Sequence, residues 1–302
     1  NDTLANTENN SLGQILFFPV FHQCNSIALD RTCQERVTRT WCVASPDQPA
    51  PIVLGATHTY QGETVSAPQS TQSKRWWQAG HGSFPASLCQ QVWDDAYAKA
   101  LALADTEGWV SVHPFDHPLI WQGHASMVRE LKDLLGHKPG AIVLAVGGGG
   151  LLAGVVAGLQ DVGWQDVPII AVETKGADSF NAALKAGRLV TLPEITSVAK
   201  CLGAKTVSAR ALECASECQV ISQLVEDVEA VQAVELFLDD ERMLVQPACG
   251  APLALLYMGR VQQLQREGHL NPDLDSIVVI VCGGSSIQLA GLQALKTQLG
   301  MK

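Results

Sequence analysis

Four consecutive glycines, Gly147, Gly148, Gly149 and Gly150, form the pattern in this chain that most directly predicts chemistry. They follow an apolar run, AIVLAV, and precede an apolar stretch with helical spacing, LLAGVVAGLQ. A strand, a glycine turn and a helix in this order present unpaired backbone N–H groups and the positive end of the helix to an anion. Side chains would block a phosphate from these amides. A turn without a ligand needs only about two glycines, so four in a row predict a phosphate-binding site.

Three apolar runs are the elements that must position this site: 141–146, 168–172 and 276–281. Each is continuous rather than alternating, which is typical of strands buried on both faces. A shorter strand is expected over 220–224. Helical patterns lie around these strands, over 120–135, 150–160, 178–186, 207–217, 227–240 and 248–268, with a last helix ending near 299. This alternation predicts an α/β fold with a parallel sheet flanked by helices.

Ligands of such sheets bind at the carboxyl ends of the strands. Three strand ends carry residues suited to binding: the glycine turn, Glu173, and the segment 282–286 (CGGSS). Because parallel strands end at the same edge of a sheet, we expect these three groups to lie close together.

Two ligands compete for the glycine turn. Gly148-x-Gly150-x-x-Ala153 matches a dinucleotide fingerprint, and Glu173 stands where a ribose-binding acid is expected, so a nucleotide-binding Rossmann oxidoreductase is one hypothesis. The fingerprint lies in mid-chain, however, and a second glycine turn ends the last strand. The alternative is a compact cofactor with one phosphate at the four glycines and a ring that reaches toward 282–286.

Composition excludes some classes of function. The chain has 302 residues, 47% of them hydrophobic and 17% charged, which is typical of a globular protein with a substantial core. Its net charge of −10 argues against nucleic acid or an anionic membrane as partner. The apolar run 15–21 is too short to cross a bilayer. Nine cysteines without a CxxC pair favour a reducing compartment, and we expect a cytoplasmic protein.

The first 91 residues differ from the rest and show no sustained period. Cys24, Cys33 and Cys42 recur every nine residues, but zinc ligands usually occur as close pairs, so no metal site is predicted there. The sequence pattern changes near Val92, where a stretch of helix-forming residues, 92–104, begins. We therefore leave 1–91 unassigned and treat 92–302 as one α/β domain.

From about Val92 to Gly300 the chain resembles the serine dehydratase/threonine deaminase family of pyridoxal-phosphate enzymes, in particular the animal serine dehydratase-like proteins. The matching motifs, in order, are PFDHPLIWQGHAS (114–126), AVGGGGLLAGVVAGLQ (145–160), VPIIAVET (167–174), ITSVAKCLGAKTV (195–207), PACGA (247–251) and VIVCGGSSI (279–287). The resemblance implies the fold of the tryptophan synthase β chain, in which 1–91 takes the place of a small domain whose pattern is not recognisable here.

The resemblance also implies roles for the cofactor-binding residues. Gly147, Gly148, Gly149 and Gly150 would bind the phosphate of pyridoxal 5'-phosphate (PLP). Cys282 would face the pyridine nitrogen, with Gly283 beside it, and Ser285 could hydrogen-bond the ring or its hydroxyl. A neutral thiol does not hold that nitrogen protonated as a carboxylate would, which favours β-elimination over transamination. His117 and His124 are expected to be structural.

A monovalent cation, potassium or a similar ion, is the second ligand that the resemblance implies. Its ligands would be the Glu173 carboxylate and the backbone carbonyls of Gly147, Ala177, Leu202 and Ala204. Oxygen atoms of this kind suit a hard cation. A carboxylate at a strand end that forms only an ion pair is the alternative for Glu173.

The catalytic lysine of the family is the residue that the resemblance does not locate. It lies in an N-terminal S-x-K-x-R-G motif and forms a Schiff base with the cofactor. Residues 1–91 contain one lysine, Lys74, without that motif, and the family spacing points to Val20. Gln246 also replaces the acidic residue of the family pattern. No catalytic residue is therefore identified.

Three functions remain open. The first is a PLP-dependent L-serine/L-threonine dehydratase, an ammonia-lyase that gives pyruvate or 2-oxobutyrate. The second is a catalytically defective dehydratase-like protein without the lysine, and the third is the nucleotide-binding oxidoreductase. The expected partners are a small amino acid and, through the resemblance, a second copy of the chain in a homodimer.

Overall fold

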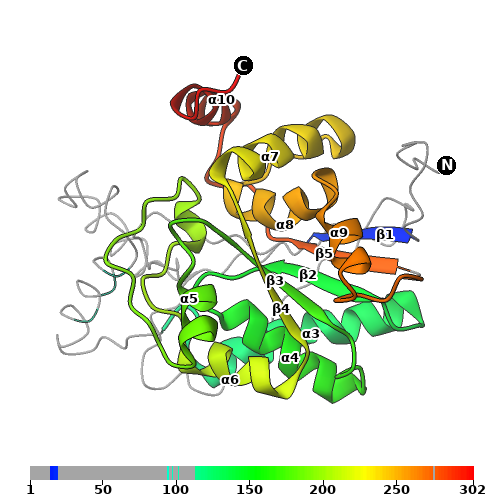
Figure 1. Ribbon diagram of the computed structural model, residues 1–302. Helices are drawn as coiled ribbons and strands as arrows, with labels where there is room; N and C mark the ends of the chain where they lie inside the picture. Colours follow the sequence, from blue (N-terminus) through cyan, green and yellow to red (C-terminus); the bar gives the residue numbers. More distant parts are fainter. Residues whose placement is uncertain (1–13, 20–93, 95–96, 98–100, 102–112, 275) are drawn as a thin grey trace, which may run out of the picture.

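A five-stranded parallel sheet forms the centre of the protein. The computed structural model describes residues 14–19, 94, 97, 101, 113–274 and 276–302. The strands are β1 (Gln14–Pro19), β2 (Ala141–Ala145), β3 (Ile169–Thr174), β4 (Val220–Val225) and β5 (Ser276–Val281). Their order in the sheet is β1-β5-β2-β3-β4, and every pairing is parallel (Figure 1). The expected α/β fold with a parallel sheet flanked by helices is confirmed.

Each face of the sheet has its own apolar core. Within β2, Ile142 and Leu144 point to one face, and Val143 points to the other, as the two-residue period of a strand requires. Strands β2, β3 and β5 are buried along almost their whole length. Continuous apolar runs are therefore needed, because helices cover both faces.

The helices divide between these two faces (Figure 1). On the Ile142 face lie α3 (Pro118–Leu135), α4 (Gly150–Val162), α5 (Ser179–Ala186) and α6 (Ala209–Glu217). On the Val143 face lie α7 (Asp227–Glu241), α8 (Pro247–Tyr257), α9 (Arg260–Arg266) and α10 (Leu289–Gln298). A short 3₁₀ turn, η3 (Lys200–Leu202), interrupts the long connection between α5 and α6.

Two predictions about the elements need correction. The pattern 248–268 predicts one long helix, but the structure has α8 and α9, which are separated at Gly259. Gly259 takes a φ of +67°, a left-handed conformation that ends a helix and that glycine adopts without strain. Strand β1 was not predicted, because its short run shows no alternation and ends at Pro19. It pairs along its full length with β5, from Gln14 opposite Ser276 to Pro19 opposite Val281.

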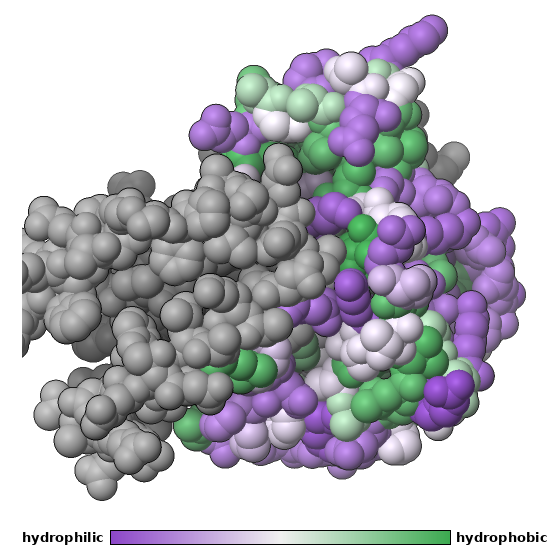
Figure 2. All heavy atoms as spheres, turned by 90° about the vertical axis from the view of Figure 1, so that its left-hand side faces the viewer, coloured by the Kyte–Doolittle hydropathy of each residue, from purple (hydrophilic) through white to green (hydrophobic). Residues whose placement is uncertain are grey.

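Several other predictions lie partly or wholly outside the described residues. Of the expected helix 92–104, only Asp94, Tyr97 and Leu101 are described, and all three are helical. Lys74 and the cysteines of 1–91 are not described. The described helices include none that is long and apolar enough to cross a membrane. On the face shown in Figure 2, the hydrophobic residues among those described form small patches between hydrophilic ones.

Candidate cofactor site

The three strand ends predicted to form a site are neighbours in the sheet. β2 lies between β5 and β3, so the glycine turn after β2 is flanked by the segment after β5 and by Glu173 at the end of β3. The chain passes from β2 outward to β3 and β4 and then returns to the other side of β2 as β5. The strand order therefore reverses beside β2, which is where ligands bind in open α/β sheets.

The glycine turn presents an unbroken series of backbone donors. Among the described residues, none provides a hydrogen-bond acceptor for the N–H groups of the segment 147–152. The first donor beyond them is Ala153, which binds the carbonyl of Gly149 at 2.9 Å. Gly149 is the N-cap of α4, and no side chain caps this helix. Six successive amides at a positive helix end form the arrangement that binds a phosphate.

Packing explains why each of the four positions is glycine. A β-carbon on Gly148 would overlap the ring of Phe115, and one on Gly150 would lie 2.6 Å from the Phe115 carbonyl oxygen. Gly149 has a φ of +93° and lies against Ala211 of α6. The backbone of Leu202 lies directly against Gly147. The turn is held between three segments distant in sequence, and none of them uses its amides.

Cys282 lies directly after β5, as predicted, and contacts a second cysteine. The side chain of Cys249, from α8, donates to the carbonyl of Gly283 at 3.5 Å. The hydrogen bond with Cys249 and burial together raise the pKa of Cys282 well above its ordinary value. Cys282 is therefore a neutral thiol at physiological pH. Ser285, the third residue predicted on this segment, is exposed to solvent.

Gln246 fixes the segment after β5 from the side of α8. Its backbone N–H donates to the Gly283 carbonyl at 3.1 Å, and its side-chain amide donates to the hydroxyl of Ser286. Gln246 is almost completely buried, whereas Ser286 is exposed to solvent. The neutral side-chain amide makes its contact with Ser286 without adding a charge to this segment.

Glu173 is fully buried and is bound by the N-terminus of α5. Its two carboxylate oxygens accept from the N–H groups of Phe180 and Asn181, each at 2.8 Å. Burial raises the pKa of Glu173 to about 8, and these two hydrogen bonds oppose the shift. Of the described lysines and arginines, none forms an ion pair with Glu173. A buried carboxylate bound in this way is not available to a ribose hydroxyl, which removes one support of the oxidoreductase hypothesis.

The other predicted cation ligands lie close to the two strand ends. The carbonyl oxygen of Leu202 lies against Gly147, and the amide of Ala204 donates to that oxygen at 3.0 Å. Ala177 is joined to Thr174, which follows Glu173, by a 3.0 Å hydrogen bond.

A buried hydroxyl at the start of α5 was missed by sequence reasoning. The hydroxyl of Ser179 is buried and has no hydrogen-bond partner among the described residues, and Ser179 immediately precedes the two residues that bind Glu173. An orphaned buried hydroxyl costs free energy unless it finds a ligand. Serine is common at the start of helices, so no sequence signal distinguished it.

Two described lysines beside the strand ends are engaged in other contacts. Lys175 pairs with Glu226, and Lys200 donates to the carbonyl of Ile195 at 2.7 Å. Both side chains are exposed. His117 caps α3 by accepting from the Leu119 N–H at 3.2 Å, which confirms its structural role. Val20 and Lys74 lie outside the described residues.

Comparison with known proteins agrees with this geometry. The chain is 53% identical over 304 residues to a human serine dehydratase-like protein, covering 96% of this chain and 92% of that protein. It is 55% identical over 239 residues to the human L-serine dehydratase/L-threonine deaminase, covering 79% of this chain and 73% of that protein. A fungal L-serine ammonia-lyase from Rhizomucor miehei superposes with a TM-score of 0.64 at 37% identity, covering 72% of both chains. Residues 72–283 match the family described as pyridoxal-phosphate dependent enzyme, and the chain belongs to that family.

Proposed function

We propose that this protein is a PLP-dependent dehydratase that removes water and ammonia from L-serine or L-threonine, giving pyruvate or 2-oxobutyrate. The series of free amides at the glycine turn carries the proposal, because it provides a phosphate site at the switch point of the sheet. The identity with relatives named L-serine dehydratase/L-threonine deaminase supports the choice of substrates. The family match favours this cofactor over a dinucleotide.

The residues of the site fit PLP in two respects. The amides of 147–152 would hold its phosphate, and Cys282 would lie near the pyridine nitrogen as a neutral thiol. When bound, PLP supplies an electron-accepting ring that stabilises negative charge at the α-carbon of an amino acid. Because a neutral thiol would not keep that nitrogen protonated, Cys282 would moderate the electron withdrawal. This property favours loss of a β-substituent over transamination.

A monovalent cation such as potassium is the second ligand of the proposed enzyme. The buried Glu173 carboxylate is without an ion-pair partner among the described residues, and the Ser179 hydroxyl has no hydrogen-bond partner. A cation at this position would favour the ionised form of Glu173, which burial disfavours, and would give the Ser179 hydroxyl a partner. With the carbonyls of Gly147, Ala177, Leu202 and Ala204, it would join the ends of β2 and β3 to the connection before α6.

The proposal extends to the setting of the enzyme. The five described cysteines are all free thiols, which agrees with a cytoplasmic location. We propose that two copies form a homodimer, as the resemblance implies. Sedimentation velocity of the PLP-loaded protein tests the dimer, and cell fractionation tests the location.

Borohydride reduction of the purified chain in the presence of PLP is the decisive experiment, combined with an assay for keto acid from L-serine and L-threonine. The proposed function predicts a pyridoxyl group on one mapped lysine together with production of pyruvate or 2-oxobutyrate. PLP binding without a covalent label and without keto acid would identify the defective alternative. Binding of NAD in place of PLP would overturn the proposal.

A further inference from the structure

A buried chain of hydrogen bonds connects the N-terminus of α7 to the end of β3. The hydroxyl of Ser197 donates to the Asp227 carboxylate at 2.6 Å and lies 2.7 Å from the hydroxyl of Thr174. The second oxygen of Asp227 accepts from the N–H of Val198 at 2.9 Å. Ser197 and Thr174 are at most 1% exposed. Asp227 thus binds two successive residues of a segment that is 30 residues away in sequence.

The direction of each proton in this chain follows from the groups present. A carboxylate only accepts, so the single proton of Ser197 goes to Asp227. The lone pairs of Ser197 then accept from the Ala199 N–H, at 3.0 Å, and from the Thr174 hydroxyl. Every hydrogen-bonding position of Ser197 is filled. A fully satisfied buried network has one low-energy arrangement, and it therefore specifies one position for the segment.

The segment held by Asp227 is the one that lies against the glycine turn. Residues 195–204, which we call the Asp227-bound segment, include η3 and continue toward Ser208. Near the end of this segment is Leu202, whose α-carbon would lie 3.0 Å from a β-carbon added to Gly147. Beyond its end, the N–H of Ser208 donates to the Gly148 carbonyl at 3.0 Å. A shift of the segment would therefore move the glycine turn.

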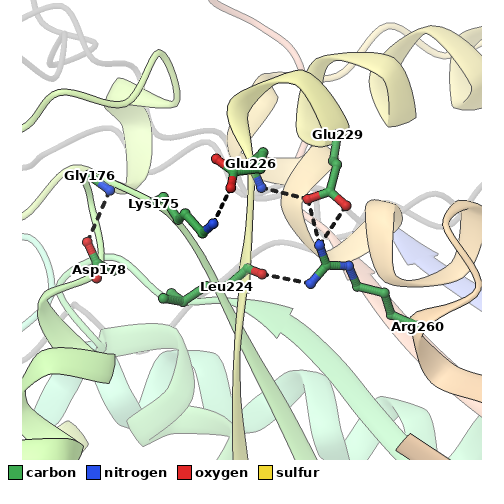
Figure 3. Close-up of polar contacts among 7 residues, drawn as sticks. All are labelled: Lys175, Gly176, Asp178, Leu224, Glu226, Glu229 and Arg260. Carbon is green, nitrogen blue, oxygen red and sulfur yellow. Dashed lines mark hydrogen bonds and ion pairs between the residues drawn. The ribbon is translucent and has the colours of Figure 1, made fainter. Parts of the chain in front are cut away.

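The helix end that carries Asp227 is itself firmly anchored (Figure 3). Glu226 and Glu229 form a capping box around it. Arg260 of α9 binds both carboxylate oxygens of Glu229, at 2.6 and 2.7 Å, and the Leu224 carbonyl at 2.9 Å. One guanidinium nitrogen, Nη2, makes both contacts with Glu229, and Nη1 binds Leu224, so Arg260 ties the start of α7 to the end of β4. Asp227 is therefore attached to a fixed support on the opposite side of the sheet from α4.

We propose that Asp227 is a positioning residue for the cofactor phosphate site. It acts through Ser197 and the Asp227-bound segment, and it fixes the backbone of the glycine turn in the geometry that presents the six amides. The inference rests on the proposed function only for the identity of the ligand. The positional claim concerns the protein alone and holds with or without bound PLP.

The test compares four versions of the full chain: the wild type, Asp227→Asn, Ser197→Ala and the double variant. Hydrogen–deuterium exchange reports on 147–152 and 195–204, and titration gives the dissociation constant for PLP. We expect faster exchange in both segments and PLP binding about tenfold weaker in each single variant, as loss of a charge-assisted hydrogen bond implies. The double variant should bind no more weakly than either single variant, because both break the same connection.

Glu226→Gln is the matched control. It removes one negative charge from the same helix end, while its side-chain amide oxygen can still accept the capping hydrogen bond from the first turn of α7. Glu226 otherwise contacts Lys175 rather than the Asp227-bound segment. It should keep wild-type exchange and affinity within about twofold, since exposed ion pairs contribute little. If Asp227→Asn does not fold, Ser197→Ala alone decides the question.

Two outcomes would overturn the inference. The inference is contradicted directly if residues 147–152 exchange hydrogen for deuterium at the wild-type rate in both single variants. It is also contradicted by a PLP affinity equal to that of Glu226→Gln. Failure of the wild type itself to bind PLP would instead count against the proposed function, while the exchange measurement would still decide whether Asp227 positions the turn.

Discussion

The ring of Phe115 lies directly against the α-carbon of Gly148, where a β-carbon would overlap it. The carbonyl of Phe115 accepts from the indole N–H of Trp121 at 2.8 Å, which ties Phe115 to α3. The glycine turn is thus supported from one side by an aromatic residue in a motif 33 positions earlier in the chain. Replacing the turn glycines and replacing their supports should therefore have similar effects on cofactor binding.

Phe115→Ala should weaken binding of PLP by removing this support. We expect a loss of about 1–3 kcal/mol in the free energy of unfolding, because the side chain is half-buried, and a higher dissociation constant for PLP. Urea denaturation and titration measure the two effects. Leu119→Ala is the control, since Leu119 is 46% exposed and should change stability by less than about 0.5 kcal/mol. Unchanged PLP affinity in Phe115→Ala would show that the turn keeps its shape without the ring.

Gly149→Ala should destabilise the protein more than Gly163→Ala does. Both glycines flank α4 and have positive φ, +93° and +74°, so alanine is strained at either position. Only Gly149 is also packed against a neighbour, Ala211, whereas an added carbon at Gly163 meets open space. We expect about 1–2 kcal/mol for Gly163→Ala and at least about 1 kcal/mol more for Gly149→Ala. Denaturation midpoints measure the difference. Equal losses of stability in the two variants would mean that Ala211 moves aside at no cost in free energy.

Removal of potassium should lower the thermal stability of the protein through Glu173. The protein should be more stable in KCl than in tetramethylammonium chloride of equal ionic strength, because a potassium ion that binds only the folded state stabilises that state. The gain is about 2.7 kcal/mol when the potassium concentration is 100 times its dissociation constant. Glu173→Gln should abolish the difference, and Ser179→Ala should reduce it.

Asp161→Asn provides the control for the potassium experiment. Asp161 pairs with Arg129 on the surface, and both side chains are 50% exposed, so the response to KCl should match that of the wild type. Equal melting temperatures of the wild type in the two salts would contradict a cation at Glu173.

The ion pair between Arg210 and Glu217 should contribute stability that disappears in acid. The hydrogen bond from Arg210 lowers the pKa of Glu217 below its ordinary value of 4.5. A depressed carboxyl pKa contributes stability that is fully present above the unfolded pKa and is lost as the pH falls through the folded pKa. Glu217→Gln should therefore cost about 0.5–1 kcal/mol at pH near 7, and the difference from the wild type should shrink below about pH 4.5.

Urea denaturation at several pH values measures this dependence. Glu213→Gln is the matched control, because Glu213 binds the same arginine at 3.3 Å but is 63% exposed. It should have a smaller effect at every pH. A difference between the wild type and Glu217→Gln that grows in acid would contradict the assignment.

Much of the fold was predictable because the pattern that encodes it is local. The strands β2, β3 and β5 coincide with continuous apolar runs, and the period of a run depends only on near neighbours in the chain. The break at Gly259 was missed, because the apolar spacing continues on both sides of a glycine whose φ the sequence does not reveal. Strand β1 was missed because it is stabilised by β5, more than 250 residues away.

The sequence by itself determined the family, the glycine turn and the strand ends that carry Glu173 and Cys282. Only the tertiary structure decided that Phe115, Leu202 and Ala211 lie against the turn, that the buried Ser179 hydroxyl has no partner among the described residues, and that Asp227 binds Ser197. Motifs arise from residues adjacent in the chain, whose types and spacing can be read directly. The residues that support the turn are distant in sequence and come into contact only after the helices have packed on the sheet. Their contacts therefore depend on the tertiary structure.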